Sequence, residues 1–176
     1  MSVVERLGVT TFRDRPVTLL GEEVKAGRQA PPFTVLANDF TPVTLDSSAG
    51  TIRLISVVPS LETPVCDQQT RRFNEEAARL PGVTVLTVSV DLPFTQARWC
   101  GASGVAAVQT VSDHRDLSFG LAYGVAIKEL RLLARAVFVV DADGEVGYAE
   151  YVPAVGRHPD YDAALHAVRA CQGNGR

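Results

Sequence analysis

A single cysteine, Cys66, stands where an apolar run gives way to a segment with helix-forming signals. The apolar run ends at Pro59, and the dipeptide Thr63-Pro64 predicts the start of a helix. This spacing places Cys66 in the first helical turn, where backbone N–H groups lack partners and the helix dipole is positive. Both features favour the thiolate, which is the nucleophilic form of cysteine. The segment therefore predicts thiol chemistry at Cys66.

Three other side chains are expected around this thiol. Thr63 lies one helical turn before Cys66, so its hydroxyl can approach the sulfur and can also cap the helix. Arg135 lies at the start of a second apolar run, and its guanidinium would stabilise a thiolate and could bind an anionic or peroxide oxygen. Pro59 is expected to force the turn before the helix and to shield the sulfur from water.

The elements that must position these residues alternate along the chain as in an α/β fold. Apolar runs predict strands at residues 10–12, 16–20, 33–37, 52–58, 83–90, 105–111, 134–140 and 145–152. Helical patterns cover residues 64–80, 93–102, 115–121 and 160–171, and Asp91 is a plausible cap of the second helix. The order βαβ followed by ββα predicts a thioredoxin-like fold, with a central mixed β-sheet flanked by helices and an added N-terminal β-hairpin.

The composition agrees with a globular protein of one domain. The chain has 176 residues, of which 46% are hydrophobic and 21% charged, so we expect a single domain over residues 1–176 with a hairpin extension in residues 1–30. The net charge of −3 argues against nucleic acid or an anionic membrane as a partner. No secretory signal is recognisable at the start, and three cysteines do not suit a secreted disulfide framework. These features predict a cytoplasmic protein in which any disulfide is transient and catalytic.

Several segments together resemble one protein family. The stretch PSLETPVC holds Pro59, Thr63 and Cys66 in the spacing P-x-x-x-T-x-x-C, which resembles the active-site motif of the peroxiredoxins. The longer run TPVCDQQTRRFNEEA is similar to that of the bacterial thiol peroxidases, a subfamily of the peroxiredoxins. The similarity continues through FRDRPVTLLGEEVKAGRQAPPF, VSVDLPFTQARWCGASGV and LLARAVFVVD, and so covers nearly the whole chain.

The resemblance implies a role for each candidate residue. Cys66 would be the peroxidatic cysteine, which a peroxide oxidises to sulfenic acid. Thr63 and Arg135 would position the peroxide, and Pro59 would line the pocket. Cys100 occupies the resolving position and would form a Cys66–Cys100 disulfide within one chain.

The same resemblance implies the substrates and partners. The enzyme would be a thioredoxin-dependent, atypical two-cysteine peroxiredoxin that reduces hydrogen peroxide and organic hydroperoxides to water and alcohols. It would use no metal or organic cofactor and would be a homodimer. An apolar pocket would favour alkyl or lipid hydroperoxides.

Other interpretations remain for several residues. Cys66 and Cys100 also suit a redox sensor or a redox-switched binding protein, although position 69 is Gln69 and the C-x-x-C signature of thiol–disulfide oxidoreductases is absent. Cys171 is expected to be a structural cysteine. Arg71 and Arg72 suit either pairing with the nearby Glu75 and Glu76 or a role at an interface. The three histidines lack the spacing of metal ligands. The segment from Asp141 to Gly144 predicts a hairpin turn.

The two active cysteines are expected at opposite ends of their helices. Cys66 begins one helix and Cys100 ends another, whereas a disulfide needs Cα atoms within about 7 Å. Closing a loop of this length would stabilise the oxidised form by roughly 3–4 kcal/mol, which is comparable to the cost of fraying a few helical turns. The sequence therefore predicts a local order–disorder switch that is linked to the redox state.

Overall fold

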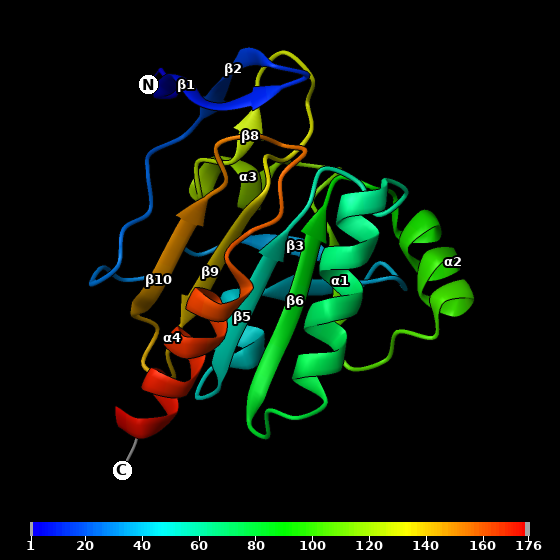
Figure 1. Ribbon diagram of the computed structural model, residues 1–176, viewed down its shortest axis with the longest axis vertical. Coiled ribbons are helices and arrows are strands. Elements are labelled where there is room, and N and C mark those ends of the chain that lie inside the picture. Colours follow the sequence, from blue (N-terminus) through cyan, green and yellow to red (C-terminus); the bar gives the residue numbers. More distant parts are fainter. Residues whose placement is uncertain (1, 175–176) are drawn as a thin grey trace.

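The computed structural model describes residues 2–174. Its large sheet contains β3 (Thr34–Leu36), β4 (Pro42–Thr44), β5 (Ile52–Val57), β6 (Val83–Ser89), β7 (Gln109–Ser112), β9 (Ala136–Val140) and β10 (Val146–Tyr151). These strands lie in the order β10-β9-β5-β6-β7-β3-β4, and Figure 1 shows β10, β9, β5 and β6 side by side. β5, β6 and β7 are parallel, and the outer strands are antiparallel to their neighbours. The predicted mixed central sheet is therefore present.

Helices cover both faces of this sheet. α1 (Pro64–Ala77) and α4 (Tyr161–Asn174) lie over one face, as Figure 1 shows. α2 (Pro93–Ser103) lies on the same side and packs beside β7. The short helix α3 (Ser118–Ala122) lies on the opposite face, where Phe119 joins the second apolar cluster and the helix packs against β3. The 3-10 helix η1 (Leu45–Ser48) contacts β4. The parallel strands are buried on both sides because successive side chains of β5 alternate between two apolar clusters.

The alternation is visible at single residues. Leu54 of β5 packs in the cluster that contains Phe73 of α1 and Leu165 of α4. Its neighbour Ile55 packs in the second cluster, with Phe119 of α3. The cluster with Phe73 also contains Cys66 and Trp99, so the two helices that carry the active-site candidates share one side of the sheet.

The predicted N-terminal hairpin is present and is fixed to the body of the fold. It consists of β1 (Glu5–Phe12) and β2 (Arg15–Leu20), and the two-residue strand β8 (Ala126–Ile127) pairs with β2. The turn falls on Arg13 and Asp14, whose φ angles of 50° and 63° lie in the left-handed region typical of tight hairpins. Thr11 also pairs with Ala154, which places the hairpin tip beside the loop after β10.

Some predicted boundaries are wrong for local reasons. The strand expected at 105–111 begins only at Gln109, because the N–H groups of Ala106 and Ala107 donate to the Asn74 side chain. The strand expected from residue 134 begins at Ala136, since the N–H of Ala134 donates to the carbonyl of Val125. α1 ends at residue 77 rather than 80, and β4 and β8 were too short for the sequence pattern to indicate.

The predicted cap of α2 is also wrong. The residue at the N-cap position is Leu92, and no side chain caps this helix. The carboxylate of Asp91 instead accepts hydrogen bonds from the hydroxyl of Ser60 at 2.7 Å and from the N–H of Leu61 at 2.8 Å. Asp91 therefore stabilises the loop that precedes α1.

Candidate active site

Cys66 is the third residue of α1 and has no exposed surface. Thr63 is the N-cap residue and Pro64 opens the helix, as the sequence predicted. N–H groups in the first turn of a helix have no partner within the helix, so they direct positive potential toward this end. The local sequence thus buries a thiol at a positive helix terminus.

Two side chains reach the sulfur. The hydroxyl of Thr63 lies 2.7 Å from Cys66 Sγ and also 3.0 Å from the carbonyl oxygen of Ser60, so its proton can serve either acceptor. The Nη2 group of Arg135 donates to Cys66 Sγ at 3.3 Å. Thr63 makes no side-chain cap of α1, because its hydroxyl faces the sulfur and Ser60 instead.

Arg135 is held by buried acceptors that carry no charge. Its side chain is 2% exposed, its Nε donates to the carbonyl of Val155 at 2.9 Å, and its Nη1 donates to Gln69 Oε1 at 2.7 Å. Within residues 2–174, no carboxylate lies within ion-pair distance of this guanidinium. A buried arginine stays charged, and an uncompensated buried charge is costly. The nearest group able to compensate it is the Cys66 sulfur, which accepts from Arg135.

Gln69 is a site residue that the sequence analysis missed. It is fully buried, it accepts from Arg135, and its Nε2 donates to the Ser56 hydroxyl at 2.7 Å. Its position, three residues after Cys66 on the same face of α1, was the available signal. Gln69 fixes the direction from which the guanidinium approaches the sulfur.

A cleft opens over these donors. Its volume is about 610 Å³, and Pro59, Thr63 and Arg135 are among its lining residues. Apolar side chains form much of the remaining wall, namely Phe12, Pro64, Val65, Leu132 and Val155. The hairpin tip contributes Arg13 and Asp14, so the N-terminal extension forms part of the same cleft. A ligand in this cleft meets both groups that contact the Cys66 sulfur.

Cys100 has different surroundings. It lies near the end of α2, is half-buried, and its Sγ is 3.4 Å from the Thr110 hydroxyl. It lines a separate cleft of about 480 Å³ together with Asn38 and Asp39. Cys66 and Cys100 are both free thiols in this structure.

Cys171 and the Asp141 turn lie away from the Cys66 sulfur and have contacts that support the fold. Cys171 is half-buried on α4 against Gly147, and burial raises the pKa of its thiol. The predicted turn at Asp141 is confirmed, because its carboxylate accepts from the N–H groups of Asp143 and Glu145. In the part of the chain that the structure describes, no three His, Cys, Asp or Glu side chains gather closely enough to hold a metal ion.

The two arginines after Cys66 pair with aspartates. Arg71 contacts Asp67, and Arg72 contacts Asp162 on α4, so the expected pairing with Glu75 and Glu76 is not what the structure shows. No helix among the described residues has the length and apolar character that crossing a bilayer requires.

Comparisons with known proteins agree with this geometry. The Redoxin family model matches residues 25–165. A thiol peroxidase of Halalkalibacterium halodurans is 67% identical over 91% of this chain and 96% of its own length, and one of Bacillus subtilis is 59% identical over the same shares. A solved peroxiredoxin-like protein of Aquifex aeolicus is 36% identical, covers 97% of this chain and 99% of its own, and superposes with a TM-score of 0.87.

These matches also confirm the predicted thioredoxin-like fold class. They cover the segments that carry Cys66, Cys100 and Arg135. The chain therefore belongs to the Redoxin family and, within it, to the bacterial thiol peroxidases.

Proposed function

We propose that this protein is a hydroperoxide reductase in which Cys66 is the peroxidatic cysteine. The names of its relatives support a peroxide-reducing antioxidant enzyme. The observation that carries the residue assignment is the pair of donors on one buried sulfur, Thr63 at 2.7 Å and Arg135 at 3.3 Å. Both donors line the open cleft, which gives a peroxide a route to them.

The first step is a displacement on oxygen. The Cys66 thiolate attacks one peroxide oxygen, an S–O bond forms, and the O–O bond breaks. The departing oxygen takes a proton and leaves as alcohol or water, while Cys66 becomes a sulfenic acid. Arg135 and Thr63 donate toward the oxygens, where negative charge develops as the O–O bond breaks. Pro59 shapes the cleft wall beside them.

The second step assigns the resolving role to Cys100. Its sulfur attacks Cys66 Sγ, an S–S bond forms, the S–O bond breaks, and water leaves. The position of Cys100 supports this step, because α2 lies directly against α1 through the contact of Trp99 with Asp67. The resulting Cys66–Cys100 disulfide is then reduced by thioredoxin through thiol–disulfide exchange.

The cleft supports a preference for organic hydroperoxides alongside hydrogen peroxide. Its wall includes Phe12, Val65, Leu132 and Val155. The alkyl group of an organic hydroperoxide can bury this apolar surface, whereas hydrogen peroxide has no apolar group to do so. The proposal includes one catalytic domain over the whole chain, a homodimer and a cytoplasmic location. The family resemblance supports these last points, and sedimentation of the reduced protein tests the dimer.

The test is thioredoxin-coupled peroxide consumption with each cysteine changed to serine. Cys66→Ser abolishes turnover, and Cys100→Ser still forms sulfenic acid but does not recycle. Cys171→Ser is the matched control and retains activity. Full steady-state activity in Cys100→Ser sinks the two-cysteine mechanism, and a peptide map of the oxidised protein identifies the pair that forms.

A further inference from the structure

The thiols of Cys66 and Cys100 face separate surroundings in the reduced protein. The Cys66 sulfur accepts from Thr63 and Arg135, whereas the Cys100 sulfur lies beside Thr110 in the other cleft. The two sulfurs share no hydrogen-bond partner. Both thiols are free, so a disulfide between them requires the two sulfurs to come together, and we expect this to move at least one helical turn.

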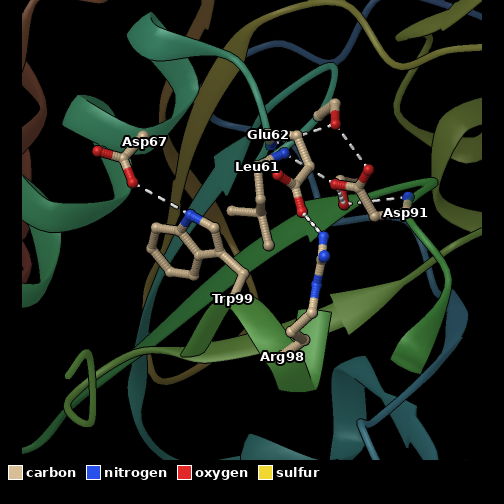
Figure 2. Close-up of polar contacts among 8 residues, drawn as sticks. Leu61, Glu62, Asp67, Asp91, Arg98 and Trp99 are labelled. Atoms are coloured by element: carbon tan, nitrogen blue, oxygen red, sulfur yellow. Dashed lines mark hydrogen bonds and ion pairs between the residues drawn. The ribbon is translucent and has the colours of Figure 1, made fainter. Parts of the chain in front are cut away.

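The residue next to each cysteine faces the opposite helix. Asp67 follows Cys66, Trp99 precedes Cys100, and the indole Nε1 of Trp99 donates to Asp67 Oδ1 at 3.1 Å (Figure 2). Trp99 is only 7% exposed, so this carboxylate satisfies the one polar atom of a buried side chain. The contact joins the two cysteine-bearing turns directly.

Arg71 strengthens the same junction. Its Nε donates to Asp67 Oδ2 at 2.8 Å, and its Nη1 donates to the carbonyl of Ser103 at the end of α2 at 3.2 Å. Its guanidinium also lies 5.8 Å from the centre of the Trp99 ring, within the range of a cation–π contact. Asp67 thus has both oxygens bonded while it bridges α1 and α2.

A second set of contacts ties the loop before α1 to the middle of α2 and to the segment that precedes α2. Glu62 forms an ion pair with Arg98, as Figure 2 shows. Asp91 accepts from Ser60 and Leu61 beside it. The Glu62–Arg98 pair is exposed, and exposed pairs contribute little to stability. The buried indole contact is the stronger restraint on the cysteine-bearing turns.

We propose that the Asp67–Trp99 hydrogen bond, supported by Arg71, is a latch that limits the rate of the resolving step. This inference rests on the proposed role of Cys100. In that step the Cys100 sulfur attacks the Cys66 sulfenic acid, the S–S bond forms, and the S–O bond breaks with release of water. Either helical turn must move for the attack, and the movement separates Asp67 from Trp99.

The latch sets a competition between two fates of the sulfenic acid. While the latch is closed, the Cys66 sulfenate can attack one oxygen of a second hydroperoxide. A second S–O bond forms, the O–O bond breaks, the departing oxygen takes a proton and leaves as an alcohol, and Cys66 becomes a sulfinic acid. Once the latch opens, Cys100 forms the disulfide instead. Asp67 and Trp99 are positioning residues, because neither contacts the Cys66 sulfur, and they leave the first oxidation unchanged.

Three variants test the latch in single-turnover experiments. Trp99→Phe removes the N–H donor, Asp67→Ala removes the acceptor, and Asp67→Asn restores an acceptor oxygen. Reduced protein is mixed with one equivalent of hydroperoxide, quenched with an alkylating agent, and analysed by mass. We expect disulfide formation to be about tenfold faster in the first two variants and nearer the wild-type rate in Asp67→Asn. Sulfenic acid formation keeps its rate in all three.

The matched control is Tyr148→Phe, which removes an aromatic donor from the Glu150 carboxylate on β10. It leaves both steps unchanged. Under excess hydroperoxide, Trp99→Phe and Asp67→Ala also accumulate less sulfinic acid than the control. Tyr148→Phe also removes one hydrogen bond from an aromatic side chain to a carboxylate, so it reproduces any general loss of stability. An effect seen in the Trp99 and Asp67 variants but not in this control is therefore specific to the latch.

Trp99 is the only tryptophan of the chain and gives a second readout. Its emission in the wild-type protein changes with disulfide formation, and in Cys100→Ser it stays constant after peroxide addition. Disulfide rates that are equal to wild type, or slower, in both Trp99→Phe and Asp67→Ala overturn the latch alone. A wild-type protein that forms no Cys66–Cys100 disulfide overturns the proposed function instead.

Discussion

Cys66 and Cys100 show how one chain holds two thiols in different surroundings. Cys66 is fully buried and accepts from a hydroxyl and a guanidinium, and Gln69 and Val155 fix the guanidinium in turn. Cys100 is half-buried and has one hydroxyl neighbour at 3.4 Å. The first arrangement is preorganised for charge on sulfur, and the second gives the thiol itself few contacts.

In the proposed mechanism, this difference assigns the peroxide reaction to the start of α1 and the conformational change to the neighbouring turn of α2. The first step needs a fixed sulfur, because transition-state charge must meet donors that are already in place. The resolving step needs displacement; the Cys100 thiol has few contacts of its own to lose, and the restraint on its turn comes from the neighbouring Trp99. The contrast between the two cysteines can be tested side chain by side chain.

Arg135→Met should give the largest effect. The variant keeps an unbranched side chain but removes the positive charge and the donor to Cys66 Sγ. We expect the second-order rate constant of Cys66 with hydroperoxide to fall by about 10²–10³-fold, the range for loss of a preorganised charge donor. Stopped-flow single turnover measures this constant. A loss below about threefold would remove Arg135 from the mechanism.

Thr63→Val should slow the same step by about 10- to 100-fold. Valine has a similar shape but cannot donate to the sulfur, and hydrogen bonds to charged groups are stronger than neutral ones. The same rapid-mixing experiment measures the change. An unaltered rate constant with unaltered stability would show that the Thr63 hydroxyl serves only Ser60.

Gln69→Leu should slow the first step by about tenfold. The substitution frees Arg135 Nη1 and allows the guanidinium to leave the sulfur. Gln172→Leu is the matched control, because Gln172 donates to the Pro81 carbonyl at the surface and touches no site residue. Equal rate constants for the two glutamine variants would show that Gln69 does not position Arg135.

Thr110→Val should change the resolving step by less than about threefold. Its hydroxyl is a distant neighbour of Cys100 Sγ and also donates to Asn38, so the thiol depends little on it. The rate of disulfide formation after one equivalent of peroxide checks this. An effect as large as that of Thr63→Val on the first step would contradict the contrast between the two cysteines.

Cys171→Ser should have the smallest effect, within about twofold on either step. Its thiol is far along α4, and burial raises its pKa, which lowers the thiolate fraction at neutral pH. Alkylation kinetics of the three cysteines check the order of reactivity. Faster alkylation of Cys171 than of Cys66 would be the contrary result.

The sequence predicted the core of the fold because its signals are local. The runs that form β5 and β6 are rich in apolar and β-branched residues, and the Asp141 turn is a tight hairpin signal. Arg135 was identifiable because an arginine is unusual at the edge of an apolar run. These features each need only a few consecutive residues to be recognised.

Features that depend on distant residues were not predictable. Gln69 acts on a guanidinium 66 residues away, and Asp91 binds the loop of Ser60 rather than its own helix. Similarly, no local pattern indicates that Trp99 points at Asp67, which lies 32 residues earlier. Such contacts follow from tertiary packing, which selects among partners that the sequence leaves equivalent.

Amide hydrogen exchange in the reduced and oxidised protein tests most directly whether Cys66 must leave its site to form the disulfide with Cys100. The amides around Cys66 in α1 and around Cys100 in α2 should exchange faster in the oxidised protein than in the reduced protein. The amides of β5 and β9 should be unchanged, since the sheet does not take part. Identical exchange around both cysteines in the two states would contradict the account.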